Sequence, residues 1–162
     1  VGITPECHKI GDVGGLGLGI KKVNNEATHH LKQSFTALGD TVDVVVFAAP
    51  QLSIIEMSEL AELCNGRQRS SKTDLIVCTS AQVYADAVSM GYVAKIETFG
   101  GRVLVGTCFY QQYGREIGEA NGWTRLLSNS AKIVNILGGY GYQPALASME
   151  ACIESAEKGR IV

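Results

Sequence analysis

The stretch Val42-Asp43-Val44-Val45-Val46-Phe47-Ala48 decides the fold of this chain. It is β-branched and almost continuously apolar, which is typical of a strand buried on both faces of a parallel sheet. Pro50 is predicted to end this strand. Ser53, with Glu56 three residues later, forms a capping box that predicts a helix ending at Asn65-Gly66. The predicted inner face of that helix consists of Met57, Leu60, Ala61 and Cys64.

The same alternation of strand and helix continues downstream. Thr73–Thr79 is predicted to be a second buried strand, Ser80–Met90 a helix, and Arg102–Val105 a third strand. The residues predicted to face inward on the second helix are Val83, Tyr84, Ala87 and Val88. Strands that alternate with helices favour a parallel sheet joined by right-handed crossovers. The sequence therefore predicts one α/β domain over residues 1–162, with three α/β/α layers and a mainly parallel, Rossmann-like sheet.

The remaining segments carry weaker signals. Asn24 or Asn25 can cap a helix that runs to about Leu38. Tyr92–Glu97 is predicted to be a short element, Ser130–Leu137 to be helical, and Pro144 to start a last helix that stops at Gly159. About twenty residues after Cys108 show no clear secondary structure, and a loop of that length is usually functional or disordered. The glycines between Gly11 and Gly19 lack the spacing and the preceding strand of a nucleotide-binding loop.

Composition limits the class of protein. The chain has 162 residues, 46% hydrophobic and 19% charged, which is enough for one globular domain. Its net charge of −2, without a basic run, argues against a nucleic-acid surface. Its five cysteines form no C-x-x-C pair and suggest no disulfide framework, so a reducing cytoplasm is expected. Because the chain begins at Val1 and not at a methionine, we expect it to be a processed product or a piece of something longer.

Candidate binding residues lie where the predicted strands end. These ends are Ala48–Ser53, Cys78–Ser80 and Gly106–Cys108, and in a parallel sheet they meet at one edge. Ser53 and Ser80 each open a helix, where free backbone N–H groups suit an anionic or carboxylate ligand. The alternative is that both serines are only helix caps. The polar residues predicted to contact a substrate at this edge are Gln51, Thr79, Ser80 and Thr107.

Two further groups could carry chemistry. Cys108 lies at a strand end, where a cysteine can be a thiolate, and Cys152 lies beside the apolar stripe of the last helix. Two cysteines alone do not hold an iron–sulfur cluster, which needs three or four ligands. The polar cluster Ser128–Lys132 includes a cation, Lys132, that could pair with a carboxylate; the alternative is a solvated helix start.

Several short motifs, in order along nearly the whole chain, resemble the large subunit of the aconitase X family. Gly2–Glu6 is similar to its G-[IV]-T-P-E-A motif, and Ala49–Ser53 with Glu56 resembles its C-P-H-x-S-x-x-E stretch. The later matches are Cys78-Thr79-Ser80, Gly91, Glu97, Gly100, Thr107-Cys108, Asn129–Lys132, and Cys152 with Ala156 and Gly159. The sequence departs from the family at Ala49, where the family has cysteine, and at Gln51, where it has histidine.

The resemblance implies the C-terminal portion of an iron–sulfur hydro-lyase, a dehydratase of a small hydroxy acid such as cis-3-hydroxy-L-proline or, in archaea, phosphomevalonate. It implies that Cys108 and Cys152 ligate a [2Fe-2S] or [4Fe-4S] cluster whose third ligand lies outside this chain. It also implies that Ser53, Ser130 and Lys132 act near the substrate, and that a small swivelling subunit completes the active site. Two alternatives remain open: a metal-free α/β ligand-binding or subunit-interaction domain, and an enzyme with Cys108 as nucleophile.

Overall fold

The computed structural model describes residues 3, 5–12, 19, 21–35 and 39–162, and the chain divides into two compact units, Val1–His30 and Leu31–Val162. In the first unit, a short 3-10 helix, η1 (Ile10–Asp12), is closed by the carboxylate of Asp12, which accepts the backbone N–H of His8 and Lys9. Helix α1 (Asn25–Ser34) begins with Asn24, whose Oδ1 accepts the N–H of Ala27 at 2.9 Å. The predicted asparagine cap is therefore confirmed, whereas the predicted end at Leu38 lies outside the described residues.

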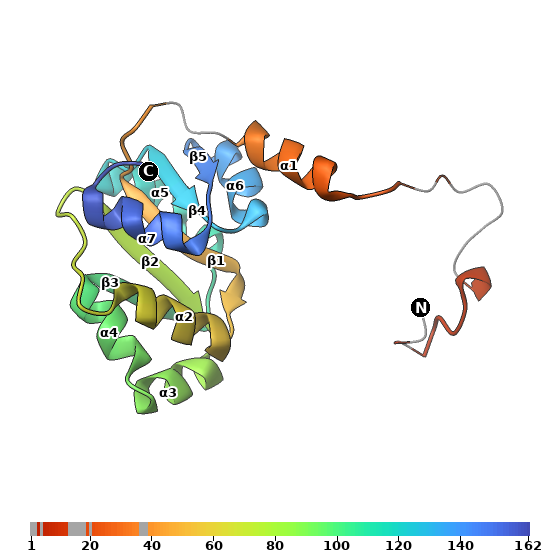
Figure 1. Ribbon diagram of the computed structural model, residues 1–162, viewed down its shortest axis with the longest axis horizontal. Coiled ribbons are helices and arrows are strands. Elements are labelled where there is room, and N and C mark those ends of the chain that lie inside the picture. The colour runs from red at the N-terminus through yellow and green to blue at the C-terminus, as the bar shows by residue number, and fades with distance from the viewer. Residues whose placement is uncertain (1–2, 4, 13–18, 20, 36–38) are drawn as a thin grey trace. The chain divides into compact units, whose positions relative to one another are not determined.

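The second unit is built on a five-stranded parallel sheet with strand order β3-β2-β1-β4-β5 (Figure 1). The strands are β1 (Val44–Leu52), β2 (Asp74–Thr79), β3 (Gly101–Val105), β4 (Arg125–Ser128) and β5 (Gln143–Leu146). The central strand β1 has neighbours on both sides, because Val45 pairs with Leu75 of β2 and with Leu127 of β4. Burial on both faces explains why the sequence of this strand is nearly all apolar. The predicted parallel α/β sheet is confirmed.

Helices cover both faces of the sheet, so the unit has three layers. Alternate residues of a strand point to opposite faces, and in β1 Val45 and Phe47 belong to one core cluster whereas Val44 and Val46 belong to the other. The helices on the first face are α2 (Ile54–Cys64), α3 (Ala81–Ser89), α4 (Tyr92–Phe99) and α7 (Met149–Lys158). In Figure 1, α2 and α7 lie in front of the sheet. The second face is covered by η2 (Phe109–Gln111), α5 (Gly114–Asn121), α6 (Ala131–Leu137) and η3 (Gly138–Tyr140).

Both predictions based on proline were wrong. Strand β1 does not end at Pro50 but runs on to Leu52, and its register with β2 shifts between Phe47 and Leu52. Proline lacks a backbone N–H, and an interrupted ladder is where a strand tolerates it. Pro144 lies in the edge strand β5 and not in a helix, because edge strands also tolerate proline. The last helix starts later, after the N-cap Ser148, whose side chain accepts the N–H of Ala151.

The segment after Cys108 has regular secondary structure, contrary to the prediction. It forms η2, α5 and β4 in succession. Helix α5 has few apolar residues, and the residues that it buries are Gly114 and Gly118: a Cβ at Gly118 would lie 2.5 Å from the hydroxyl oxygen of Tyr142. The prediction for helix α3 was right for one inner residue and wrong for another. Ala87 is buried, whereas Val88, which was also predicted to face inward, is 49% exposed.

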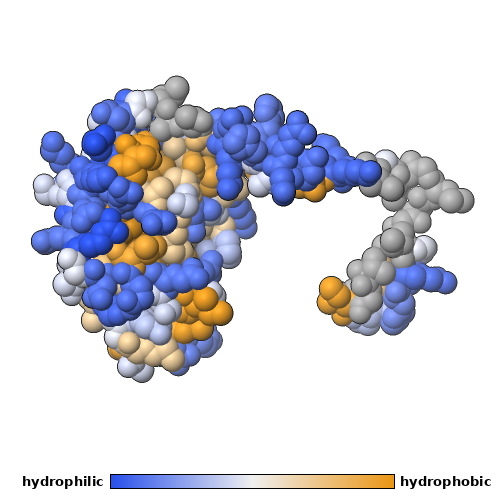
Figure 2. Space-filling view, in the orientation of Figure 1, coloured by the Kyte–Doolittle hydropathy of each residue, from blue (hydrophilic) through white to orange (hydrophobic). Residues whose placement is uncertain are grey.

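On the face seen in Figure 2, hydrophobic residues lie in small separate groups between hydrophilic ones. Scattered apolar residues of this kind are normal on the surface of a globular unit. Among the described residues, no helix combines the length and the apolar character that crossing a bilayer requires.

Candidate functional site

A crevice opens between the ends of β1 and β4, where the sheet changes its direction of winding. Strand β1 is followed by α2 on one face, and β4 is followed by α6 on the other face. The two connections therefore diverge at the carboxyl edge of the sheet. Open α/β sheets bind ligands at such a switch point, so the topology alone marks this crevice as the candidate site.

The crevice contains a cavity of about 350 Å³. It is lined by the end of β1, the first turn of α2 and the start of α6, through Ala48, Ala49, Pro50, Leu52, Glu56, Asn129, Ser130, Ala131 and Lys132. Ligand pockets of small molecules are typically several hundred Å³ in volume, with a few polar groups on an apolar wall. This cavity has the size and the mixed lining that a small polar metabolite requires.

Ser130 joins the two walls of the cavity. Its hydroxyl donates to the carbonyl oxygen of Ala49 at 2.7 Å and accepts the backbone N–H of Ile133, so it also caps α6. The neighbouring hydroxyl of Ser128 donates to the carbonyl of Val46 at 2.6 Å. Ala49 has a φ of 49° and precedes a cis peptide bond to Pro50; the left-handed conformation of a residue with a Cβ costs about 1–2 kcal/mol. The hydrogen bond from Ser130 helps to hold the backbone of Ala49 in this conformation. The hydroxyl proton of Ser130 is used in this bond.

Lys132 and Glu56 give the cavity one positive and one negative charge. Lys132 is exposed, and its Nζ lies 6.0 Å from the centre of the Tyr110 ring. The Oε2 atom of Glu56 accepts the backbone N–H of Ser53 at 2.8 Å and the Ser53 hydroxyl at 2.7 Å. The sequence indicated Glu56 as part of a capping box and of a family motif, but not as a residue of the site. Its place in the turn that follows a strand end was the signal that could have assigned it to the site as well.

The other predicted contact residues lie around the cavity, outside its lining. Thr79 is buried, and its hydroxyl donates to the carbonyl of Leu52 at 2.7 Å. Ser53 and Ser80 cap α2 and α3. The Nε2 of Gln51 donates to the carbonyl of Thr107 at 2.9 Å. Thr79 and Gln51 thus link segments of the carboxyl edge to one another, whereas Ser53 and Ser80 fix only the first turns of their own helices. The role of these residues as direct substrate contacts stays a prediction.

The structure does not bring Cys108 and Cys152 together. Cys108 is buried in the core cluster that contains Ala48 and Ala49, whereas Cys152 is buried in the cluster on the opposite face of the sheet. Burial raises the pKa of the Cys152 thiol well above its ordinary value and so favours the neutral form, whereas a metal ligand is a thiolate. Within the described ranges, no three His, Cys, Asp or Glu side chains form a group that could hold a metal ion. The two cysteines therefore do not fit one cluster in this arrangement.

Burial also makes the other core thiols unreactive, which alkylation can test. The pKa values of Cys64 and of Cys78 are raised to about 12, mainly by burial; at Cys78 the nearby Cys108 contributes to the increase and a hydrogen bond from the Phe109 backbone opposes it. At about pH 8 we expect iodoacetamide to modify Cys7 in the folded chain and to modify Cys64, Cys78 and Cys152 only after denaturation, because the thiolate is the nucleophile. Peptide mass spectrometry measures this order. Modification of Cys152 as fast as Cys7 in the folded chain would contradict the packing of α7.

The fold and the crevice define a parallel α/β domain with a cavity at the carboxyl edge of its sheet, which is where such sheets bind their ligands. Residues 42–158 match the family model for the aconitase X third domain. The chain therefore belongs to the aconitase X family, and the predicted resemblance is confirmed.

Known relatives agree with this assignment. The cis-3-hydroxy-L-proline dehydratase of Pseudomonas aeruginosa is 31% identical over 165 residues, which cover 99% of this chain and 28% of the relative. The phosphomevalonate dehydratase large subunit of Thermococcus kodakarensis is 28% identical over 127 residues, which cover 78% of this chain and 31% of the relative. The chain thus spans less than a third of the length of either relative.

A solved structure shows the same fold. The crystal structure of aconitase X from Thermococcus kodakaraensis in its holo form superposes with a TM-score of 0.67 at 23% sequence identity. The match covers 83% of this chain and 33% of the other chain.

Proposed function

We propose that this chain is the C-terminal part of the large subunit of an aconitase-X-type hydro-lyase, which removes water from a small hydroxy acid. The observation that carries the proposal is the cavity at the switch point, which combines the cation Lys132 with the hydrogen-bonded wall of Ser130 and Ala49. An ammonium group pairs with a carboxylate through a charge-assisted hydrogen bond. The names of the relatives as dehydratases, and as large subunits, support the same reading.

The charges of the cavity favour a zwitterionic substrate such as cis-3-hydroxy-L-proline. Lys132 would bind the carboxylate of the imino acid, and Glu56 would face its protonated ring nitrogen. Because Glu56 is already an acceptor for the Ser53 N–H and hydroxyl, its position is fixed before the substrate arrives. A doubly charged phosphate would meet repulsion from this carboxylate. The relative that is 31% identical is named a cis-3-hydroxy-L-proline dehydratase, which supports this choice of substrate.

Ser130 is proposed to contact the substrate from the wall of the cavity, and Ser53 to act through Glu56. As the Ser130 hydroxyl donates to Ala49, it can serve as a base or donor only by exchanging that bond for one to the substrate. The substrate-binding roles of Gln51, Thr79, Ser80 and Thr107 are proposed as indirect, through the loops that they fix.

An iron–sulfur cluster is part of the proposal only at the level of the family. Cys108 is packed in the hydrophobic core on the face of the sheet that also holds Ala48 and Ala49 of the cavity wall. Cys152 is packed in the hydrophobic core on the opposite face. Iron and acid-labile sulfide in the intact, anaerobically purified protein, beside Cys108→Ser and Cys152→Ser variants, measure whether either cysteine is a ligand.

The separation of the two cysteines favours a second candidate function. A metal-free ligand-binding or subunit-interaction domain would keep the cavity and need no cluster ligands. Absence of iron in the folded intact protein would support this candidate over the hydro-lyase. The proposed partners are the N-terminal part of the large subunit and a small swivelling subunit, and the proposed location is the cytoplasm.

The central test is the replacement of Lys132 by Met in the intact protein. We expect the KM for cis-3-hydroxy-L-proline to rise about tenfold or more, because a hydrogen bond to a charged group contributes about 1.5–3 kcal/mol. Lys72, an exposed lysine outside the cavity, supplies the control Lys72→Met, whose KM should match that of the unmodified protein. Equal KM values for both variants would rule out carboxylate binding at Lys132.

A further inference from the structure

The loop after β3 is fastened to the sheet at three points. The N–H of Gly106 donates to the carbonyl of Thr79 at 2.8 Å, and Gln51 donates to the carbonyl of Thr107 at 2.9 Å. Phe109 is buried, with its ring centre 6.4 Å from that of Trp123 and 6.1 Å from that of Tyr142. The backbone around η2 is therefore held firmly, with one side chain directed into the core.

Tyr110 follows Phe109 in η2, and its ring lies near the site. The Nζ of Lys132 is 6.0 Å from the ring centre, which is within the range of a cation–π contact. Within the described ranges, Lys132 takes part in none of the carboxylate ion pairs, which join Arg67, Arg69, Lys95 and Lys158 to their partners. The aromatic ring is thus the neighbour that restrains an otherwise exposed ammonium group.

We infer that Tyr110 is a positioning residue, which holds the ammonium group of Lys132 at the cavity, and that Gln51 supports it by fixing the loop that carries Tyr110. A lysine side chain loses rotamer entropy when it is fixed. A ring that already restrains the side chain lowers the entropy loss left for substrate binding. The effect on catalysis rests on the proposed function, but the contact between Tyr110 and Lys132 does not.

The first test reports on Lys132 without any substrate. In the intact protein, the rate at which an N-hydroxysuccinimide ester acylates Lys132 is measured by peptide mass spectrometry. Tyr110→Leu should raise this rate about two- to fivefold, because it removes a cation–π contact of about 0.5–1 kcal/mol. Tyr110→Phe retains the ring and should restore the original rate. Tyr113→Leu is the control, since Tyr113 lies in the same loop and is 78% exposed.

The second test separates positioning from chemistry. Tyr110→Leu should raise the KM for cis-3-hydroxy-L-proline by a similar factor of about two to five and leave kcat unchanged. In the Lys132→Met background the same change should have no further effect on KM.

The two proposals fail in different ways. An acylation rate that is the same in Tyr110→Leu as in Tyr113→Leu, or that Tyr110→Phe does not restore, overturns the role of Tyr110. If the acylation rate depends on the ring while Lys132→Met leaves KM unchanged, Tyr110 does position Lys132, and the proposed function of the cavity is the part that falls.

Discussion

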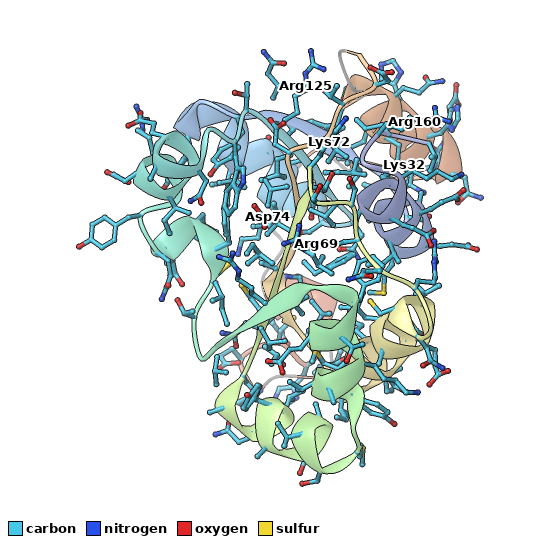
Figure 3. All side chains as sticks on the ribbon, turned by 90° about the vertical axis from the view of Figure 1, so that its left-hand side faces the viewer. Lys32, Arg69, Lys72, Asp74, Arg125 and Arg160 are labelled. Carbon is cyan, nitrogen blue, oxygen red and sulfur yellow. The ribbon has the colours of Figure 1, made fainter. Side chains whose placement is uncertain are left out.

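Replacement of Arg69 by Met is expected to lower the free energy of unfolding of the chain by about 3 kcal/mol. The guanidinium group donates to the carbonyls of Gly100 (2.9 Å), Ser70 (3.0 Å) and Thr73 (2.7 Å), and it lies 3.3 Å from Asp74 (Figure 3). Asp74 also accepts the indole N–H of Trp123. Loss of the arginine would leave several partly buried acceptors without a donor, and that penalty exceeds the value of an exposed ion pair.

Two comparisons make this prediction specific. Arg69→Lys should lose most of the same stability, because a lysine keeps the charge but cannot supply the planar set of donors. Arg102→Met is the matched control, since Arg102 is an exposed arginine of β3, and its effect should stay within about 0.5 kcal/mol. Urea unfolding measures all three. A loss for Arg69→Met no larger than the loss for Arg102→Met would show that the contacts at this edge contribute little.

Gly118→Ala is expected to cost about 2 kcal/mol, although alanine is the better helix former. The added methyl group would lie 2.5 Å from the hydroxyl oxygen of Tyr142 and 2.8 Å from its Cζ. Tyr142 is buried and cannot move freely, because its hydroxyl donates to the carbonyl of Gly114 at 2.6 Å. Gly139→Ala is the control, since a Cβ at that position meets nothing within 4 Å.

A double-mutant cycle identifies the clashing atom. Tyr142→Phe alone should cost about 1 kcal/mol, because it leaves the carbonyl of Gly114 without its donor. It also removes the oxygen that the new methyl group would meet, so the double variant should be at least about 1 kcal/mol more stable than the sum of the single effects predicts. Strict additivity would show that Gly118 is required for a reason other than its distance from Tyr142.

The parts of the fold that could be predicted are those in which local and global signals agree. The capping box at Ser53 and the predicted inner face of α2 are both confirmed, because the burial of Met57, Leu60, Ala61 and Cys64 follows directly from helical periodicity. Helix α5 could not be predicted in this way, since Gly114 and Gly118 are its buried residues and glycine is a weak helix former. Tertiary packing against Tyr142 decides its structure.

The candidate site could also be predicted only in part. That the ends of the predicted strands meet at one edge followed from the strand–helix alternation. Ser130 and Lys132 were placed near the substrate by the family resemblance, and both line the cavity. The alternation could not tell which strands are neighbours, so it could not show that β4 lies beside β1 or that Cys108 and Cys152 lie on opposite faces of the sheet. Glu56 was assigned to helix capping and to a family motif but not to the site, because a capping box is a complete local explanation of its position.

The placement of β1 at the centre of the sheet has a consequence for synthesis on the ribosome. Strands β2 and β3 emerge soon after β1 and can pair on one side of it, whereas the partner on its other side, β4, is completed only at Ser128. Until then a nascent chain carries Val44 to Val46, fully buried in the finished molecule, along an open backbone edge. An apolar edge strand of this kind pairs readily with other chains. Translation speed through the segment between β3 and β4 therefore sets how long the chain remains prone to aggregation.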